Sequence, residues 1–282
     1  MAKITLRPHQ KEAIEKALSV RNALFCVAVG KGKTFASMFL ARHLLNNKQI
    51  DKAIFCVTLS GIGVFKNEFQ NVGVDVQAIS TVEELIEFFK SKKKFILVKH
   101  SFIEELGKDQ NKVDMIEDYL KEDYKKIMLV IDEAHKMGNH ESWGNFAIDS
   151  TRRFYEKIVL LTATPYSSKL EQIFGLVKLI YPTVWKELKD FKALYLEEKP
   201  VKDWRTGKFI RMETLAYVNL AGLRKQMEPF TFFYYPKINL IYHEHTVKLE
   251  PENYAEYKRM CQEIHTELKE RPSKGKKKEE ED

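Results

Sequence analysis

Val27 to Phe35 reads VAVGKGKTF and lies between an apolar run and a helical pattern. The phosphate-loop pattern GxxxxGK[ST] is incomplete here, because Val27 stands at the position of its first glycine. The context still favours a phosphate loop: a buried strand from Leu24 to Val29 leads in, and a helix beginning near Lys33 leads out. The free N–H groups at the start of such a helix point at the loop. The alternative is a glycine turn with an incidental lysine.

The side chains of this loop suit a nucleoside triphosphate. Gly30 and Gly32 permit backbone conformations and a close approach of the ligand that a side chain would obstruct. Lys33 supplies a cation to the β and γ phosphates, and Thr34 offers its hydroxyl to Mg²⁺. Together with Lys31 between the glycines, these residues predict a nucleoside triphosphate as the ligand and Mg²⁺ as its metal.

A second motif, IMLVIDEAHKMGN, places two carboxylates directly after an apolar run. Asp132 and Glu133 would lie at the C-terminal end of a strand, where an open α/β sheet binds its ligands. We expect Asp132 to hold Mg²⁺ through water and Glu133 to orient and deprotonate the attacking water. Glu133, Asp132 and Lys33 are the predicted catalytic residues, and Thr34 and Asp132 are the predicted metal residues. A surface acidic pair, the alternative, explains poorly why the carboxylates follow a buried strand.

Two shorter motifs complete the predicted site. In LLTATPYSS, the hydroxyls of Thr162 and Thr164 can bond His135 or the acidic pair across neighbouring strand ends. Such bonds would couple the nucleotide site to another surface. In LRPHQKEAI, Gln10 precedes a helix, and its amide can pair with the N6 and N7 edge of adenine, which selects ATP over GTP. Arg7 of the same motif is assigned to the ATP site.

Apolar runs alternate with helical patterns between residues 23 and 162: ALFCVAV, KAIFCVT, VDVQAIS, KFILVKH, KIMLVID and KIVLLTA. Runs that are apolar throughout suit parallel strands covered on both faces. The predicted fold class is α/β, a P-loop lobe with a mostly parallel sheet flanked by helices and a helical C-terminal extension. After residue 165 come helical, aromatic-rich segments, SSKLEQIFGLVKLIY and TVWKELKDFKALYLEE, and a strand-like or hairpin piece, WRTGKFIRMETLAYV.

These patterns divide the chain into three predicted parts. We expect an ATP-binding lobe over residues 1–166 and a helical, aromatic-rich extension over 167–268 that completes the lobe. Residues 269–282 are a charged tail whose composition predicts disorder.

The composition is that of a globular protein. The chain has 282 residues, of which 44% are hydrophobic and 31% charged, and no apolar run approaches the roughly 18 residues of a membrane span. The N-terminus lacks the core of a signal peptide, so we expect an intracellular, cytoplasmic or nuclear protein without membrane contact. A net charge of +7 leans towards a polyanionic partner. Cys26, Cys56 and Cys261 are widely separated, which predicts neither a disulfide nor a metal site.

In their order along the chain, the four motifs resemble the first RecA-like lobe of superfamily-two helicases, and most closely that of the Swi/Snf-type DNA translocases. LRPHQ is similar to the adenine-reading Q motif, VGKGKT to motif I in its GxGKT form, DEAH to motif II and TATP to motif III. DEAHKMGNHES also follows the Swi/Snf pattern in which Asn139 and Ser142 recur after the box. The resemblance extends over residues 5 to 260 and implies a RecA-like fold and ATP-dependent activity.

The resemblance also implies double-stranded DNA as a partner. VTLSGIGVFKNEF is similar to motif Ia, which tracks the DNA backbone in the family, and LVKHSFI resembles the next DNA-contacting segment. On this basis the candidate contacts to phosphates are Lys66, Lys99, His100 and Ser101.

The chain departs from the family pattern in three places. Thr58 stands where motif Ia usually has proline, Phe65 where it usually has tryptophan, and FTFFYYPKI where the family often has paired arginines. The family also has a second RecA-like lobe, whose arginines complete the ATP site. No later segment has room for that lobe, and arginine fingers contribute about 10³–10⁵ in rate. We therefore expect this chain to bind ATP but hydrolyse it poorly until a second lobe is supplied in cis or in trans.

The sequence leaves three hypotheses. The first is the ATP-binding lobe of an ATP-dependent DNA helicase or translocase, an ATP hydrolase in which His135, Thr162 and Thr164 couple the site to nucleic acid. The second is a helicase-like binding module or regulatory subunit that docks on DNA or a partner protein without productive turnover. The third, a P-loop kinase or transferase, is disfavoured by the DEAH box and by the lack of an evident acceptor site.

Overall fold

The computed structural model describes residues 5–166, 169–236, 250, 253–260 and 262. Its contacts divide the chain into two units, Met1–Pro236 and Lys237–Asp282. In the second unit, residues 253–260 and residue 262 are helical and exposed. Cys261 and the predicted tail over 269–282 lie outside the described residues.

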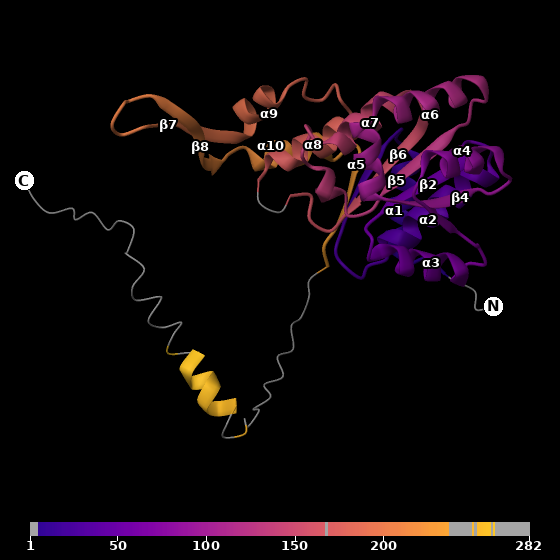
Figure 1. Ribbon diagram of the computed structural model, residues 1–282, viewed down its shortest axis with the longest axis horizontal. Coiled ribbons are helices and arrows are strands. Elements are labelled where there is room, and N and C mark those ends of the chain that lie inside the picture. Colours follow the sequence, from indigo (N-terminus) through magenta and orange to yellow (C-terminus); the bar gives the residue numbers. More distant parts are fainter. Residues whose placement is uncertain (1–4, 167–168, 237–249, 251–252, 261, 263–282) are drawn as a thin grey trace, which may run out of the picture. The chain divides into compact units, whose positions relative to one another are not determined.

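A sheet of parallel strands in the order β3-β4-β2-β5-β6-β1-β9 forms the centre of the first unit (Figure 1). Its strands are β1 (Ala23–Val27), β2 (Lys52–Val57), β3 (Gln77–Ile79), β4 (Phe95–Lys99), β5 (Ile127–Ile131), β6 (Tyr155–Thr162) and β9 (Thr231–Tyr234). The apolar runs read from the sequence are β1 to β6, and β9 comes from the aromatic segment FTFFYY. The predicted α/β class with a mostly parallel sheet is confirmed.

Helices fill the connections between these strands. They are α1 (Pro8–Leu18), α2 (Lys33–Asn46), α3 (Gly61–Asn71), α4 (Val82–Lys90), α5 (His100–Lys108), α6 (Gln110–Glu122), α7 (Trp143–Thr151), α8 (Glu171–Ile180), α9 (Leu188–Tyr195) and α10 (Leu220–Met227), with short 3₁₀ turns at η1 (Ala134–Met137) and η2 (Arg152–Phe154). Capping residues set several of the starts. Thr81 Oγ1 accepts from the N–H of Glu84 at 3.2 Å, while the Glu84 carboxylate accepts from the N–H of Thr81 at 3.1 Å, a capping box that begins α4.

Side chains along each strand alternate between two hydrophobic cores. On β1, Phe25 packs in the core that contains residues of α1, α2 and α3. Its neighbours Leu24 and Cys26 belong to the core that contains residues of α4 to α8. Because both faces of the sheet are buried, the strands are apolar throughout instead of alternating with polar residues. Cys26 and Cys56 are free thiols inside this packing, and burial raises the pKa of Cys26 to about 12.

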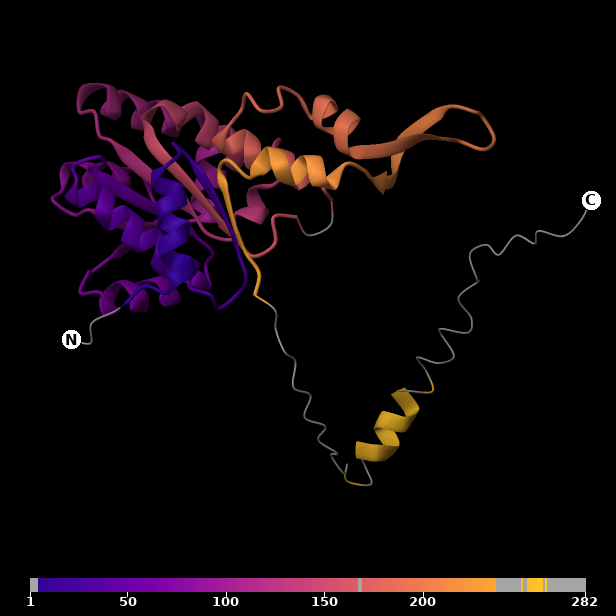
Figure 2. The same ribbon diagram turned by 180° about the vertical axis from the view of Figure 1, so that it is seen from behind.

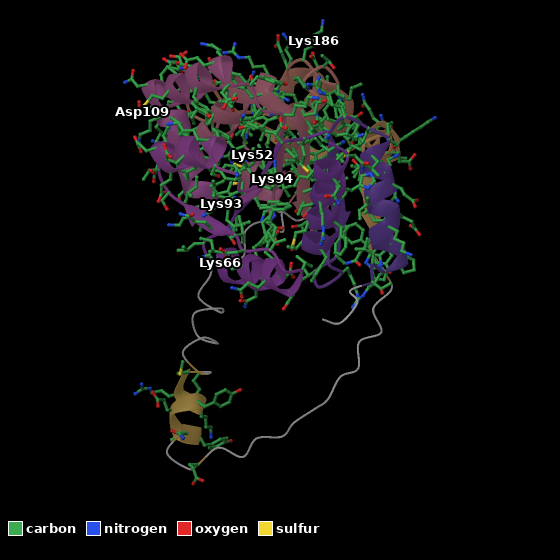
Figure 3. All side chains as sticks on the ribbon, turned by 90° about the vertical axis from the view of Figure 1, so that its right-hand side faces the viewer. Lys52, Lys66, Lys93, Lys94, Asp109 and Lys186 are labelled. Carbon is green, nitrogen blue, oxygen red and sulfur yellow. The ribbon has the colours of Figure 1, made fainter. Side chains whose placement is uncertain are left out.

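Two buried lysines, Lys157 and Lys52, close the C-terminal ends of α1 and α4. Their Nζ atoms each donate to three backbone carbonyls at 2.6–2.8 Å, those of Ala17, Val20 and Arg21 for Lys157 and those of Phe88, Ser91 and Lys93 for Lys52. Lys52 and Lys93 are labelled in Figure 3. Burial lowers the pKa of both side chains to about 8. The ammonium, which has three donors for three carbonyls, is therefore the main form at neutral pH. These lysines are structural caps that hold helix ends against the start of a strand.

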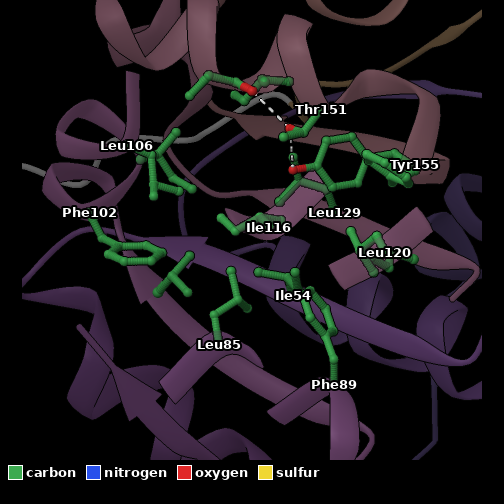
Figure 4. A pocket seen from close by; sticks show the side chains of 16 residues that line it. Ile54, Leu85, Phe89, Phe102, Leu106, Ile116, Leu120, Leu129, Thr151 and Tyr155 are labelled. Carbon is green, nitrogen blue, oxygen red and sulfur yellow. Dashed lines mark hydrogen bonds between the residues drawn. The ribbon is translucent and has the colours of Figure 1, made fainter. Parts of the chain in front are cut away.

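A cavity of about 30 Å³ lies in the core, between side chains such as Ile54 of β2, Leu129 of β5 and Phe102 of α5 (Figure 4). Apolar side chains such as Phe102 and Leu129 line it, and Thr151 and Tyr155 supply its polar groups. Thr151 Oγ1 donates to the carbonyl of Ala147 at 2.8 Å, so the hydroxyl of Tyr155 donates to Thr151 at 3.0 Å. This volume is far below that of a small-molecule site, and the lining of the cavity is mainly apolar. We regard this cavity as a packing gap.

A two-stranded antiparallel hairpin, β7 (Leu196–Lys202) and β8 (Phe209–Tyr217), extends away from the sheet (Figures 1 and 2). The hairpin piece read from the sequence is its turn and β8. The helical pattern predicted through TVWKELKDFKALYLEE is wrong at its end, because α9 stops at Tyr195 and Leu196 begins β7. Pro200 follows shortly and cannot continue a helix. In the described part of the chain, no helix has both the length and the apolar composition that crossing a membrane requires.

Candidate functional site

The residues predicted for ATP meet at the carboxyl edge of three neighbouring strands. β5, β6 and β1 are adjacent and parallel, so the loop after β1, the acidic pair after β5 and Thr162 at the end of β6 come together. A cleft of about 650 Å³ opens at this edge, a volume typical of small-molecule sites. It is lined by Thr5, Leu6, Arg7, Gln10, Val29, Gly30, Gly32, Lys33, Thr34, Phe35, Val64, Glu68, Asp132 and Glu133. Every residue predicted for ATP or Mg²⁺ lines the cleft except Lys31.

The loop between β1 and α2 presents backbone donors to this cleft. Gly30 and Gly32 have φ values of +71° and +78°, in the left-handed region that side chains rarely adopt. Gly32 is the N-cap of α2 and provides no side chain to cap the helix. The first N–H groups of α2 are therefore available to a bound anion. Lys33 Nζ donates to the carbonyl of Val27 at 3.2 Å, which holds the ammonium against the same loop.

Asp132 and Glu133 form an electrostatically strained pair at the end of β5. Burial, followed by the negative charge of Glu133, raises the pKa of Asp132 to about 6. Glu133 has a φ of +45°, which is left-handed backbone in a residue other than glycine. Such conformations are retained where the surroundings impose them, and they cluster at functional sites. Two carboxylates held this way attract a cation.

Glu68 of α3 also lines the cleft, and sequence reasoning missed it. Burial, followed by the charge of Asp132, raises the pKa of Glu68, while hydrogen bonding with the side chain of Thr34 lowers it. Its Oε2 atom is buried without a hydrogen-bond partner among the described residues. The sequence held one indication, because Glu68 stands between Phe65 and Phe69 on the buried side of α3.

The donor set of the cleft suits Mg²⁺. The hydroxyl of Thr34 and the carboxylates of Asp132 and Glu68 are hard oxygen ligands, which this ion prefers. In the described part of the chain, no group of three or more His, Cys, Asp or Glu side chains is arranged to hold a metal alone. That fits Mg²⁺ at nucleotide sites, where water and phosphates supply most of the ligands.

His135 links the acidic pair to the end of β6. Its Nδ1 lies 3.3 Å from Glu133 Oε2 and 3.3 Å from Thr162 Oγ1. The hydroxyl of Thr162 donates to the carbonyl of Thr164 at 2.8 Å, so Thr162 is an acceptor towards His135. His135 therefore carries its proton on Nδ1 and donates it towards both oxygens. Thr164, also predicted here, takes part through its backbone, since its N–H donates to Thr162 Oγ1 at 3.1 Å.

His9 and Gln10 fasten the phosphate loop to α1. The expectation that Gln10 precedes a helix is wrong, because α1 begins at Pro8 and Gln10 lies in its first turn. Its Nε2 donates to the carbonyl of Gly32 at 3.1 Å. Its Oε1 accepts from the N–H of Arg7 at 2.8 Å, so both ends of the amide bond the protein. His9 Nε2 donates to the carbonyl of Lys31 at 2.8 Å. His9 is part of the LRPHQ motif, but the sequence alone indicates no role for it.

The four residues predicted for nucleic acid have different surroundings. Lys66 is exposed on α3 (Figure 3), Lys99 is half-buried at the end of β4, and Ser101 is exposed in the first turn of α5. His100 Nε2 donates to the carbonyl of Asp132 at 2.8 Å, and burial lowers the pKa of His100. This ring is therefore neutral at neutral pH and faces the acidic pair.

Comparison with known proteins gives a consistent family. A model described as type III restriction enzyme, res subunit, matches residues 3–167. The uncharacterized ATP-dependent helicase YqhH of Bacillus subtilis is 25% identical over 62% of this chain and 29% of its own length. The human DNA repair and recombination protein RAD54B is 27% identical over 70% of this chain and 22% of its own. Protein CHROMATIN REMODELING 5 of Arabidopsis thaliana is 25% identical over 79% of this chain and 14% of its own length. The chain thus spans less than a third of the length of these relatives.

Solved structures have the same fold. The Sulfolobus solfataricus SWI2/SNF2 ATPase core domain matches over 94% of this chain and 52% of its own chain, with a TM-score of 0.59 and 17% sequence identity. The same core in complex with dsDNA matches 96% of this chain and 55% of its own, with a TM-score of 0.57 and 16% identity. The first RecA-like lobe expected from the motifs is therefore the fold that the chain adopts.

Proposed function

The chain belongs to the family described as type III restriction enzyme, res subunit, and on that premise we propose that it is the ATP-binding first lobe of an ATP-dependent DNA helicase or translocase of Swi/Snf type. The observation that carries the proposal is the shared cleft. Lys33 and Thr34 after β1 and the Asp132–Glu133 pair after β5 line one pocket on neighbouring strands. The full activity would couple ATP hydrolysis to movement on double-stranded DNA.

The residues of the cleft have distinct proposed tasks. The open N–H groups of the loop and the ammonium of Lys33 bind the phosphates. Glu133 orients a water molecule towards the γ phosphate and accepts its proton. Thr34 and Asp132, with Glu68 beside them, hold Mg²⁺. When bound, this ion neutralises charge that develops on the phosphate oxygens.

Recognition of the base and coupling are assigned to the edges of the cleft. We propose that Gln10 and Arg7 contact adenine and that the amide of Gln10 exchanges a protein hydrogen bond for one to the base. His135 and Thr162 join the catalytic carboxylate to the strand end at which Thr164 begins the next loop. A change at Glu133 during turnover is thereby transmitted to a surface outside the cleft.

The proposal includes two partners. Double-stranded DNA is supported by the Sulfolobus core, which was solved in complex with dsDNA. A second RecA-like lobe, in the same polypeptide or in another, is supported by the lengths of the relatives, of which the chain spans 14–29%. Arginines from such a lobe would raise the rate by about 10³–10⁵. The lobe described here would then bind ATP well and hydrolyse it slowly.

The test is ATP binding and turnover by the chain, with and without double-stranded DNA and with and without an added second lobe. We expect Lys33→Ala to abolish ATP binding. Glu133→Gln should retain binding and lose turnover, because it keeps the shape of the side chain but cannot accept a proton. Absence of ATP binding by the parent chain under all of these conditions would refute the proposal. ATP binding with no turnover, even with both partners present, would favour a docking module instead.

A further inference from the structure

The distal half of the β7–β8 hairpin carries an excess of positive charge. The segment KPVKDWRTGKFIR, residues 199–211, has five basic residues and one acidic residue, against a net charge of +7 for the whole chain. Lys199 forms an ion pair with Glu213 at 3.7 Å. Lys202, Lys208 and Arg211 are exposed and take part in no ion pair with the described residues.

The tip of the hairpin is held rigidly by its one carboxylate. Asp203 Oδ1 accepts from the N–H groups of Arg205 and Thr206 and from the hydroxyl of Thr206, at 2.7–3.0 Å. The backbone closes the turn through bonds of 2.8 Å from Asp203 N–H to Lys208 and from Gly207 N–H to Asp203. Hydrogen bonding lowers the pKa of Asp203, which keeps this carboxylate ionised and directed into the turn. The side chains that the turn presents outward are therefore preorganised.

The turn and the first residues of β8 carry large, apolar and exposed side chains. Trp204 is 83% exposed, Phe209 61% and Ile210 56%. The guanidinium of Arg205 lies over the ring of Trp204, 4.6 Å from its centroid. An isolated two-stranded hairpin gains little stability by itself. Exposed aromatic residues on a rigid turn indicate a contact surface.

The base of the hairpin is, in contrast, fixed to the core. Tyr195, Leu196, Leu223 and Met227 are buried in the same hydrophobic cluster. The N–H of Val218 donates to the carbonyl of Tyr195 at 2.9 Å. The seven residues of β7 then extend over roughly 20–24 Å at the usual rise of a strand. The tip is therefore held away from the sheet by a firm support (Figure 1).

We propose that this hairpin binds the major groove of double-stranded DNA, with Lys202, Lys208 and Arg211 on the phosphates and Trp204 at the leading tip. The inference rests on the proposed function, in which double-stranded DNA is the nucleic acid along which the protein moves. A two-stranded ribbon fits the major groove of B-DNA, which is about 12 Å wide. The cations lie on both strands of the hairpin, Lys202 on β7 and Lys208 and Arg211 on the β8 side, so each strand faces one phosphate wall. Three exposed cations without acidic partners in the described residues match the phosphates of a polyanion, which favours DNA as the occupant.

The first experiment measures binding of the full chain to a fluorescein-labelled DNA duplex by anisotropy over a range of salt. The test variant combines Lys202→Gln, Lys208→Gln and Arg211→Gln. The control combines Lys90→Gln, Lys108→Gln and Lys121→Gln, which removes the same charge from α4, α5 and α6. Each phosphate contact contributes about 0.9 to the slope of log affinity against log salt, so we expect the test variant to lose about 2.7 of slope and about tenfold or more in affinity. The control should retain the parent slope within about 0.9.

Trp204→Ala should weaken duplex binding by about fivefold without changing the slope, because the indole carries no charge. Trp204→Phe should recover much of the loss. Double-stranded RNA of the same sequence is the second arm, since its major groove is too deep and narrow for side chains to read. The hairpin substitutions should change its binding much less than that of DNA.

The inference is overturned if the parent chain does not bind duplex DNA or if the hairpin and control variants lose affinity equally. It is also overturned if the hairpin substitutions affect only binding to anionic lipid vesicles. Nucleotide binding by the same variants separates this failure from that of the proposed function. If the hairpin variants bind DNA like the parent while Lys33→Ala abolishes ATP binding, the proposed role of the hairpin is refuted. The proposed ATP site is then unaffected.

Discussion

The ring of His9 is stacked on the ring of Tyr234, with centroids 4.1 Å apart and planes 6° from parallel. Tyr234 ends β9, the edge strand beside β1, and its carbonyl accepts from the N–H of Ala28 at 3.0 Å. Since His9 also bonds the carbonyl of Lys31, α1, β9 and the phosphate loop are tied at one point.

We expect His9→Ala to loosen this loop and weaken ATP binding by about three- to tenfold, the effect of one lost hydrogen bond. Calorimetric titration with ATP measures the change. Tyr234→Leu should weaken binding less, and the double variant should show that the two effects are coupled. His43→Ala, an exposed histidine at the other end of α2, is the control. Independent, additive effects of the two substitutions would contradict the link.

Gly32→Ala should abolish ATP binding. The φ of +78° is strained for any side chain, and an added Cβ would also displace the amide of Gln10 from the carbonyl of Gly32. Gly63→Ala on α3 is the matched control, because nothing lies within 4 Å of its added Cβ. It should preserve binding and stabilise the fold by up to about 1 kcal/mol, as alanine is the better helix former. Equal ATP affinity for both variants would show that the loop tolerates a different backbone.

Asp132→Asn should stabilise the metal-free protein at neutral pH. The pKa of Asp132 is raised from 3.8 to about 6, so the folded state favours the protonated carboxyl and the ionised form destabilises it. At pH 7 the gain is about 3 kcal/mol. This gain in unfolding free energy falls by about half at pH 5. It vanishes below the pKa of 3.8 that Asp132 has in the unfolded chain, because the carboxyl is then protonated in both states. Urea unfolding in EDTA measures it, with the exposed Asp118→Asn expected to change little. A gain that does not depend on pH would exclude ionisation as the cause.

Glu68→Gln should weaken ATP binding more with Mg²⁺ present than in EDTA. The carboxylate of Glu68 lies by Thr34 and Asp132, and an amide is a much poorer ligand for this ion. Titrations with a fluorescent ATP analogue in both buffers give the ratio of the two affinities. Glu83→Gln, an exposed change on α4, should leave that ratio unchanged. An identical ratio for the parent and Glu68→Gln would separate Glu68 from the metal.

Thr162→Val should preserve ATP affinity and reduce DNA-stimulated turnover. Valine keeps the shape of this buried side chain but removes the oxygen that faces His135 Nδ1. Steady-state kinetics with and without DNA should show a fall in kcat with little change in KM. Thr164→Val should be mild, because Thr164 bonds Thr162 through its backbone. Equal loss of basal and stimulated turnover would assign Thr162 to the chemical step instead.

Much of the site could be read locally. The phosphate-loop motif spans nine residues, Val27–Phe35, from the end of a strand to the first turn of a helix, and the acidic pair directly follows a buried strand. The geometry of each motif is set by residues next to one another in the sequence. The dihedral preferences of glycine shape the loop, and the end of an apolar run marks the end of a strand. The sequence also predicted the hairpin turn, but the helical pattern before it led to a wrong assignment of the first residues of β7.

The amino-acid sequence by itself determined the two-faced burial of the strands, the phosphate loop and the carboxylates at their ends. Only the tertiary structure decided that β9 pairs with β1, that His9 stacks on Tyr234 and that Glu68 enters the cleft. The physical reason is that these contacts join segments far apart in the chain. Their positions follow from the order of strands in the sheet. That order is selected by the packing of two whole cores, and no short segment of sequence specifies it.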